Sequence, residues 1–234
     1  MIGFYDYTVL LTYISLLSAG TGIVVSLSGG GHPYIGMFFL LICGLCDAFD
    51  GKVARTKKDR SEIENKFGIQ IDSLSDIVAF GVLPACIGAA MLRHSSFFGN
   101  IQAKYQHFWY VDLGKYLLFA VLILYILAAM IRLAYFNVTE EERQKKEDGA
   151  RKYYTGLPVT SAALIFPSVL LLQYITKADI TPVYFVTVIF TALAFLLKFQ
   201  MRKPGLRGIM IMIGIGALEF ALIILLILVK KGIV

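Results

Sequence analysis

The stretch "DAFDGKVARTKKDRSEIENKFGIQIDSLSD", residues 47–76, places four aspartates on the two sides of one short basic loop. The rest of the chain is apolar, since 58% of its 234 residues are hydrophobic and only 16% are charged. An isolated charge at the centre of a membrane helix costs about 3 kcal/mol. Four acidic side chains in such a sequence therefore indicate a functional site.

Outward from this stretch, the chain contains seven apolar windows of about 20 residues, the length that crosses the hydrocarbon core of a bilayer. They are residues 8–28, 34–54, 69–92, 116–137, 157–176, 182–200 and 208–229. The pattern predicts an all-α polytopic membrane helix bundle. Six or seven transmembrane helices are expected, because hydropathy does not decide whether the final pair makes two full crossings.

Basic residues predict how this bundle is oriented. The loops around 52–66, 143–152 and 198–207 carry 6, 5 and 4 lysines and arginines. Because cytoplasmic loops are enriched in these residues, we expect a multi-pass protein of the cell membrane with a cytoplasmic N-terminus. The carboxylates would then lie near the cytoplasmic face.

The spacing of the aspartates predicts that they converge. Residues three or four apart share a helix face, so Asp47 pairs with Asp50 and Asp72 with Asp76. The two helices are expected to be antiparallel and joined by a short loop, which brings both pairs to one end of the bundle. Converging carboxylates repel one another unless a cation neutralises them. Oxygen ligands without histidine or thiolate favour Mg²⁺, Mn²⁺ or Ca²⁺, and magnesium commonly shares its shell with substrate phosphates.

Small residues stand beside these carboxylates. Gly51, Ala54 and Gly68 remove side-chain bulk, which allows a ligand to approach the helix backbone closely. The alternative is close packing of membrane helices through small residues. Together with four aspartates, the pattern favours a ligand site.

The two halves of the stretch match a known signature. "DAFDGKVAR" at 47–55 and "GIQIDSLSD" at 68–76 resemble the pattern of the CDP-alcohol phosphatidyltransferase family. The family usually has eight residues between the arginine, here Arg55, and the second glycine, here Gly68. In this chain Thr56–Phe67 provides twelve.

Other segments resemble the branch of that family that makes phosphatidylserine. They are "DSLSDIVAFGVLPA" at 72–85, "RLAYFN" at 132–137 and "YTGLPVTSAA" at 154–163. The resemblance covers about 6–176, which we take as the catalytic core of a single integral membrane domain, 1–234. The additional C-terminal transmembrane helices, about 182–229, rest on hydropathy.

The resemblance implies an enzyme that transfers the phosphatidyl group of CDP-diacylglycerol to the hydroxyl of L-serine, with CMP as the leaving group. It implies a divalent cation, Mg or Mn with Ca possible, a lipid bilayer, no nucleic acid and a homodimer. Asp76 would be the catalytic base. The implied metal ligands are Asp47, Asp50, Asp72 and Asp76, and the implied CDP-binding residues are Gly51, Ala54, Arg55 and Gly68.

Three further polar residues lie within or beside apolar spans. Arg132 ends a span, where a guanidinium needs an anion such as the serine carboxylate or a phosphate; the alternative is snorkelling to the interface. Asn137 either binds substrate or caps the helix end. Glu219 lies in the last span without a partner that the sequence identifies.

Two other functions remain open at this stage. The same chemistry could use glycerol 3-phosphate or inositol phosphate as acceptor, although these would require additional basic residues. A divalent-cation channel or transporter could line its path with the aspartates, but it would place them along a pore or at the midplane of the bilayer.

Overall fold

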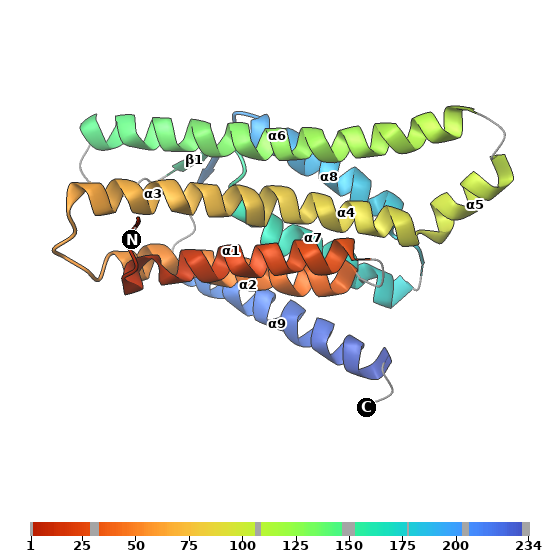
Figure 1. Cartoon of the computed structure of the whole chain (residues 1–234), viewed down its shortest axis with the longest axis horizontal. Coiled ribbons are helices and arrows are strands. Elements are labelled where there is room, and N and C mark those ends of the chain that lie inside the picture. Colours follow the sequence, from red (N-terminus) through yellow and green to blue (C-terminus); the bar gives the residue numbers. More distant parts are fainter. Residues whose placement is uncertain are drawn as a thin grey trace.

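A computed structural model describes residues 2–28, 33–105, 109–146, 153–176, 178–202 and 206–230. Long helices lie side by side along the longest axis of the molecule (Figure 1). In chain order the elements are α1 (Tyr7–Leu27), α2 (Pro33–Ala54), α3 (Glu62–Asp76), η1 (Ile77–Val82), α4 (Leu83–His94), α5 (Ser96–Tyr105), α6 (Trp109–Lys146), β1 (Tyr153–Thr155), η2 (Val159–Ser161), α7 (Ala162–Thr176), α8 (Thr181–Leu196), β2 (Gln200–Arg202) and α9 (Leu206–Lys230).

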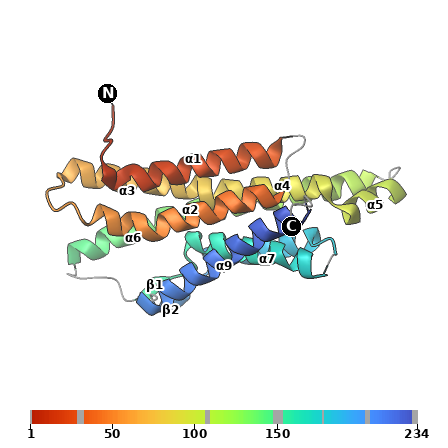
Figure 2. The ribbon, with the colours of Figure 1, turned by 90° about the horizontal axis from the view of Figure 1, so that it is seen from below.

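The first two helices form an antiparallel hairpin along which α3, η1 and α4 are laid (Figures 1 and 2). Polar side chains of α1 tie the hairpin together, since the Ser18 hydroxyl donates to the Phe39 carbonyl over 3.2 Å. The Ser75 hydroxyl donates to the Thr12 carbonyl over 3.3 Å and fixes the end of α3 against α1. The helices that carry the aspartates are therefore held in one register.

The segment η1 is a π-helical stretch that begins directly after Asp76. Its position follows from Pro84, which has no N–H to donate to the carbonyl of Phe80 four residues earlier. The Tyr125 hydroxyl of α6 donates to that carbonyl over 2.6 Å, and the Tyr184 hydroxyl of α8 donates to the Pro84 carbonyl over 2.7 Å. Two buried tyrosines thus satisfy the backbone where the helix departs from α geometry.

The core of the bundle is aromatic around these tyrosines. The rings of Tyr125 and Phe166 have centroids 5.6 Å apart, and those of Phe166 and Tyr184 are 5.1 Å apart. Large apolar side chains such as Leu17 and Phe190 instead face outward, at 71% and 67% exposure. An apolar exterior around a closed set of helices is suited to lipid.

Several helices have the length and composition of membrane spans. Tyr7–Leu27, Glu62–His94 and Val111–Arg143 satisfy both conditions, while Val159–Leu172 and Thr181–Leu196 are shorter apolar helices. The predicted class, an all-α polytopic membrane protein, is confirmed. The number of crossings and the cytoplasmic N-terminus stay predictions.

The predicted all-α class leaves out one short sheet. β1 pairs with β2 in antiparallel register, with Tyr154 opposite Met201. The turn after β1 requires Gly156, whose φ is +75° and whose N–H donates to the Phe199 carbonyl over 2.6 Å. The sheet explains why the predicted span 182–200 was wrong at its C-terminal end, where the helix stops at Leu196.

Two other predicted ends also differ. The span predicted at 157–176 begins its α-helix only at Ala162, because η2 precedes it. The helix predicted at 116–137 is longer in both directions, since α6 runs over Trp109–Lys146. The predicted basic loop 143–152 therefore begins inside α6, and its residues 147–152 lie outside the described residues.

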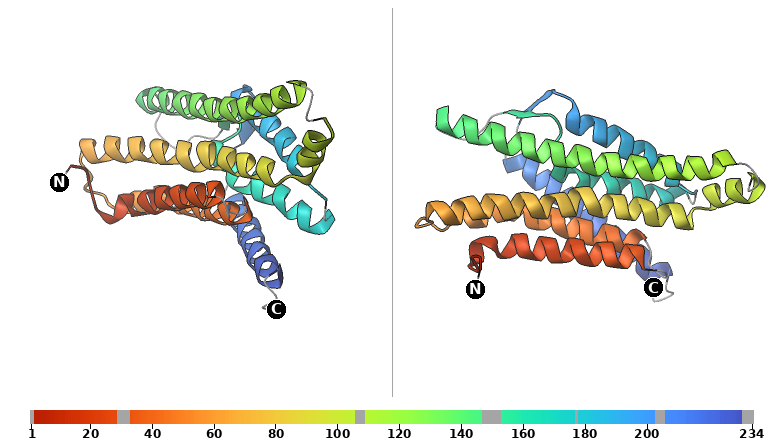
Figure 3. Two further views of the ribbon diagram at one scale, coloured as in Figure 1. Left: turned by 45° about the vertical axis from the view of Figure 1, so that its right-hand side comes forward. Right: turned by 45° about the horizontal axis from the view of Figure 1, so that its top comes forward.

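The last helix, α9, runs at an angle to the hairpin of α1 and α2 (Figure 3). It contacts α2 and α7. Glu219 of α9 is buried at 4% exposure, and the Ser168 hydroxyl of α7 donates to its Oε1. The partner that the sequence did not identify is therefore a serine of α7.

Candidate active site

Three of the four signature aspartates come together. Asp47 and Asp50 lie in the last two turns of α2, and Asp72 lies in α3. One carboxylate oxygen from each lies within 4.8 Å of the other two. All three side chains are half-buried. The loop from α2 to α3 lies at the same end of the bundle as the N-terminal residues (Figure 1).

Asp76 lies one turn further along α3 and is almost fully buried, at 8% exposure. It is not part of the group of three whose oxygens meet within 4.8 Å. Its backbone is held on both sides, by Ser75 bonded to α1 and by η1 bonded to α6. A buried acid in a fixed position beside a carboxylate cluster suits a group that accepts a proton from a bound substrate.

Within the described ranges, no basic side chain is paired with the cluster. Among the described residues, no ion pair involves any of the four aspartates. Three carboxylates within 4.8 Å repel one another, so the arrangement requires positive charge from elsewhere. The donors are all hard oxygens, which fits Mg²⁺ or Mn²⁺ and also admits Ca²⁺.

The two signature glycines are covered by arginines rather than by a neighbouring helix. A Cβ atom at Gly51 would lie 3.7 Å from Nη1 of Arg55, and one at Gly68 would lie 2.8 Å from Nη2 of Arg60. By contrast, a Cβ at Gly44 of α2 would meet the Cβ of Ala163 of α7 at 2.5 Å. Helix packing explains the latter glycine, whereas Gly51 and Gly68 lie beneath movable side chains.

The lengthened segment Thr56–Phe67 has a defined conformation. Its second half is the first turn and a half of α3, which begins with a capping box: the Glu64 N–H donates to the Ser61 hydroxyl over 3.2 Å, and the Ser61 N–H donates to the Glu64 carboxylate over 2.7 Å. Four residues make about one helical turn. The extra length is therefore compatible with an α3 that begins about one turn earlier.

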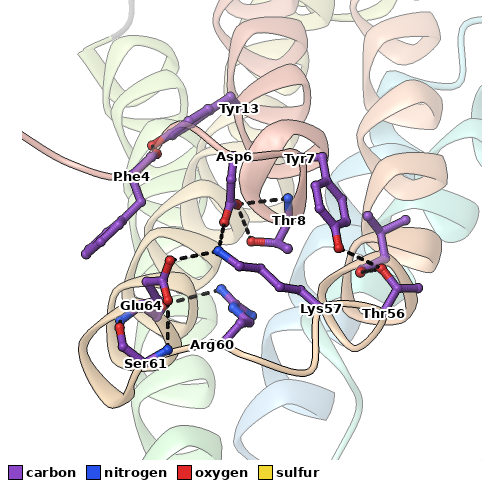
Figure 4. A network of polar contacts seen from close by, with 11 residues as sticks. Phe4, Asp6, Tyr7, Thr8, Tyr13, Thr56, Lys57, Arg60, Ser61 and Glu64 are labelled. Carbon is purple, nitrogen blue, oxygen red and sulfur yellow. Dashed lines mark hydrogen bonds and ion pairs between the residues drawn. The ribbon is translucent and has the colours of Figure 1, made fainter.

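Lys57 ties this loop to the N-terminal segment (Figure 4). Its ammonium group lies 2.6 Å from Oδ2 of Asp6 and 2.8 Å from Oε1 of Glu64. The hydrogen bond from Lys57, followed by that from Thr8, lowers the pKa of the Asp6 carboxyl to about 2. Asp6 is also the N-cap of α1, so Lys57 joins the start of α1 to the first turn of α3 through its two ion pairs.

The remaining site candidates lie on α2 and α6. Ala54 is half-buried and is the last residue of α2, one turn after Asp50. The Asn137 amide donates to the Ser73 hydroxyl over 2.7 Å, which places α6 beside the residue that follows Asp72. Asn137 lies inside α6, which continues to Lys146, so the alternative that it caps the helix end was wrong.

Arg132 is buried against the segment that follows β1. Its Nε–H donates to the Leu157 carbonyl over 3.0 Å, and its guanidinium carbon lies 5.6 Å from the centre of the Phe136 ring. It lines a small cavity of about 150 Å³ together with Lys198 and Thr155. At 5% exposure it does not snorkel to the surface, which excludes the alternative of an interfacial arginine.

Some residues of this region were missed by sequence reasoning. Pro84 in "DSLSDIVAFGVLPA" was a visible signal for the break in helix geometry after Asp76. Tyr125, which satisfies the freed carbonyl, gave no local signal because it lies on a distant helix. Arg60 and Lys57 looked like ordinary basic loop residues.

The family model for CDP-alcohol phosphatidyltransferases matches residues 8–227, which includes α9. A CDP-diacylglycerol–serine O-phosphatidyltransferase of Saccharomyces cerevisiae is 34% identical over 165 residues, covering 65% of this chain and 50% of that protein. An archaetidylserine synthase of Methanothermobacter thermautotrophicus is 32% identical over 156 residues, covering 66% of this chain and 54% of that protein. This chain spans about half the length of these relatives. No solved structure matches it. With a family match over nearly its whole length, the chain belongs to the CDP-alcohol phosphatidyltransferase family.

Proposed function

We propose that this protein transfers the phosphatidyl group of CDP-diacylglycerol to L-serine and releases phosphatidylserine and CMP. The observation that carries the proposal is the cluster of Asp47, Asp50 and Asp72, three carboxylates within 4.8 Å at the end of a bundle with an apolar exterior. Such a cluster can hold cations against a diphosphate at a membrane surface, where the acyl chains of the substrate stay in lipid. The names of the relatives support serine as the acceptor.

The aspartates would hold the divalent ions of the reaction. Asp47, Asp50 and Asp72 form the first group of ligands, and Asp76 would complete it from the next turn of α3. Bound Mg²⁺ or Mn²⁺ would stabilise negative charge on the attacking and leaving oxygens.

Asp76 would act as the base. The serine hydroxyl oxygen attacks the phosphorus that carries the diacylglycerol, and its proton passes to the Asp76 carboxylate. The new O–P bond replaces the P–O bond to CMP, which leaves with the electron pair. The buried, doubly anchored position of Asp76 keeps this carboxylate oriented while other groups move.

The surface beside the cluster would receive the nucleotide. Gly51 and Gly68 leave their backbones open to a ligand once the overlying arginine side chains move, and Ala54 and Arg55 flank the same side. For the acceptor, Arg132 lies in a cavity that Lys198 also lines, which suits the serine carboxylate. Asn137, bonded to Ser73, would help to position it.

We also propose where the enzyme is located and how it assembles. The basic loop between α2 and α3 supports a site at the cytoplasmic face of the cell membrane. The apolar exterior of the bundle supports a homodimer within the bilayer as well as contact with lipid.

A comparison of acceptors tests the proposal. Purified protein in detergent is supplied with CDP-diacylglycerol, Mn²⁺ or Mg²⁺, and serine, glycerol 3-phosphate or inositol phosphate. We expect CMP and a serine-containing lipid only with serine. If a lipid product forms with another acceptor instead, the proposed reaction type holds and the proposed acceptor, serine, is wrong. No CMP with any acceptor, together with divalent-ion flux in proteoliposomes, would overturn the proposal in favour of a transporter.

A further inference from the structure

We propose that Arg60, in the lengthened loop, binds the diphosphate of the cytidine nucleotide. The inference rests on the proposed function, because it assigns a residue to that same site. Arg60 lies outside the signature residues, and it belongs to the segment Thr56–Phe67 that is four residues longer than the family's usual spacing.

The first observation is where the Arg60 guanidinium lies. Its Nη2 is 2.8 Å, and its Cζ 3.7 Å, from the position of a Cβ on Gly68. Gly68 precedes Asp72 by four residues and therefore shares its face of α3. The guanidinium thus covers the helix one turn from the carboxylate cluster, on the side of the loop.

The second observation is what Arg60 bonds. Its Nη2 donates to the Glu64 carbonyl over 3.2 Å. Its Nε is buried and has no hydrogen-bond partner within the part of the chain that the structure describes. A buried N–H of a charged group without an acceptor is costly, so the site favours an anion that would accept this hydrogen bond.

In the described part of the chain, Glu64, whose carbonyl accepts the hydrogen bond from Arg60, forms no ion pair with it. Both carboxylate oxygens of Glu64 are already used, Oε1 by Lys57 and Oε2 by the Ser61 N–H (Figure 4). No ion pair of Arg60 occurs among the described residues. Lys57 and the capping box therefore fix the loop and leave the positive charge of Arg60 available to a ligand.

The third observation is that a second arginine occupies the equivalent place on the facing helix. The Arg55 guanidinium lies 3.7 Å from the Cβ position of Gly51, beside Asp50. The negative charges of the aspartates would neutralise much of the positive charge of divalent ions bound at the cluster. The negative charge of a diphosphate therefore needs further cations. Arg55 and Arg60 supply one from each side, and arginine forms paired hydrogen bonds with phosphate.

The test is binding of CDP without turnover. The dissociation constant of CDP is measured by calorimetry in detergent with Mn²⁺ for the wild type, Arg60→Ala and Arg60→Lys. Lys58→Ala is the matched control, since Lys58 is an exposed cation of the same loop. We expect Arg60→Ala to weaken CDP binding about tenfold, Arg60→Lys to recover part of the loss, and Lys58→Ala to match the wild type.

Two further ligands identify which phosphate is bound. Arg60→Ala should weaken CMP less than CDP, and it should leave phosphatidic acid in mixed micelles unaffected, because the diphosphate provides the added contact. The KM for CDP-diacylglycerol should rise about tenfold, with kcat and the KM for serine within twofold. A residue that only supports the loop would instead lower kcat and thermal stability together.

Several outcomes would overturn the inference. If Arg60→Ala binds CDP as tightly as the wild type, Arg60 does not contact the diphosphate. If Lys58→Ala loses as much CDP affinity as Arg60→Ala, the effect comes from the total positive charge of the loop and not from Arg60. If Arg60→Ala does not fold, Arg60→Gln, which keeps a donor for the Glu64 carbonyl, must show the same loss. If the wild type turns over CDP-diacylglycerol and the Arg60 variants bind CDP normally, only this inference is contradicted. If the wild type does not bind CDP, the proposed function is contradicted too.

Discussion

The acidic side chains of two regions of the bundle have different surroundings. At the junction of α2 and α3, Asp47, Asp50 and Asp72 bring oxygens within 4.8 Å of one another. In α9, Glu219 is buried alone and accepts a hydrogen bond from the Ser168 hydroxyl. The other Glu219 oxygen, Oε2, is buried and has no hydrogen-bond partner among the described residues. A lone acid has no neighbouring carboxylate to repel it, whereas three facing carboxylates repel one another and require a cation. Convergence of acids, rather than burial of an acid, therefore marks the functional region.

The largest expected effect follows from removing one member of the cluster. Asp72→Asn keeps the shape of the side chain and removes a charged ligand, so CMP release should fall about a thousandfold. Glu219→Gln, the matched change in the other region, should leave the rate within twofold. A loss at Glu219 equal to that at Asp72 would break the distinction between the two regions.

The next effect concerns the acceptor. Arg132→Ala removes a buried guanidinium from the cavity that Lys198 also lines, and we expect the apparent KM for serine to rise about tenfold. Steady-state kinetics with serine varied at saturating CDP-diacylglycerol measure it. An unchanged KM would remove Arg132 from the acceptor site.

Metal binding should separate the two regions by stability. A ligand present at 100 times its dissociation constant stabilises the folded state by about 2.7 kcal/mol. Mn²⁺ should therefore raise the Tm of the wild type and of Glu219→Gln by several degrees, and that of Asp72→Asn much less. If Asp72→Asn gains as much as the wild type, the cluster is not where the ion binds.

The position of Asp76 should depend on the distant tyrosine that supports η1. Tyr125→Phe leaves the buried Phe80 carbonyl without its donor, at a cost of about 1–3 kcal/mol of stability. Tyr184→Phe removes the side-chain donor to the Pro84 carbonyl, which lies inside α4 and further along the chain from Asp76. Thermal unfolding should show the larger loss for Tyr125→Phe, and kcat should fall only in that variant. Equal kcat values would mean that η1 does not position the base.

The smallest effect is expected where opposite charges already meet in water. Lys57→Met removes the pairs with Asp6 and Glu64, and such pairs contribute little to stability because water and salt screen them. Because the pKa of Asp6 is lowered to about 2 in the folded protein, its contribution is complete above its unfolded pKa of about 4 and disappears as the pH falls through 2. Unfolding measured from pH 6 to pH 2 should show the variant and the wild type converging. A large gap that persists at pH 2 would contradict this account of the pair.

The site was more predictable than the C-terminal half of the fold. Helical spacing of 3 and 4 residues placed Asp47, Asp50 and Asp72 on faces that meet, because a short loop between antiparallel helices leaves few alternatives. The pairing of β1 with β2 could not be foreseen in the same way. Its partners Tyr154 and Met201 are far apart in sequence, and each lies beside an apolar run that hydropathy extends into a span.

The conformation of the long loop was equally hidden from the sequence. Its composition predicted only a basic connection, whereas Lys57 bonds Asp6 at the start of the first helix and Arg60 covers Gly68. Such contacts depend on where the N-terminal segment lies relative to the loop in the folded protein. The spacing of residues within the loop does not predict that position.

The most direct test of the account is CMP release from CDP-diacylglycerol by the purified protein, with and without serine and EDTA, alongside Asp76→Asn. We expect release that needs serine, stops with EDTA and is abolished in Asp76→Asn while the variant stays folded. Serine-dependent release that survives both EDTA and the Asp76→Asn change would contradict it, because the carboxylates would then hold neither the ions nor the base of the reaction.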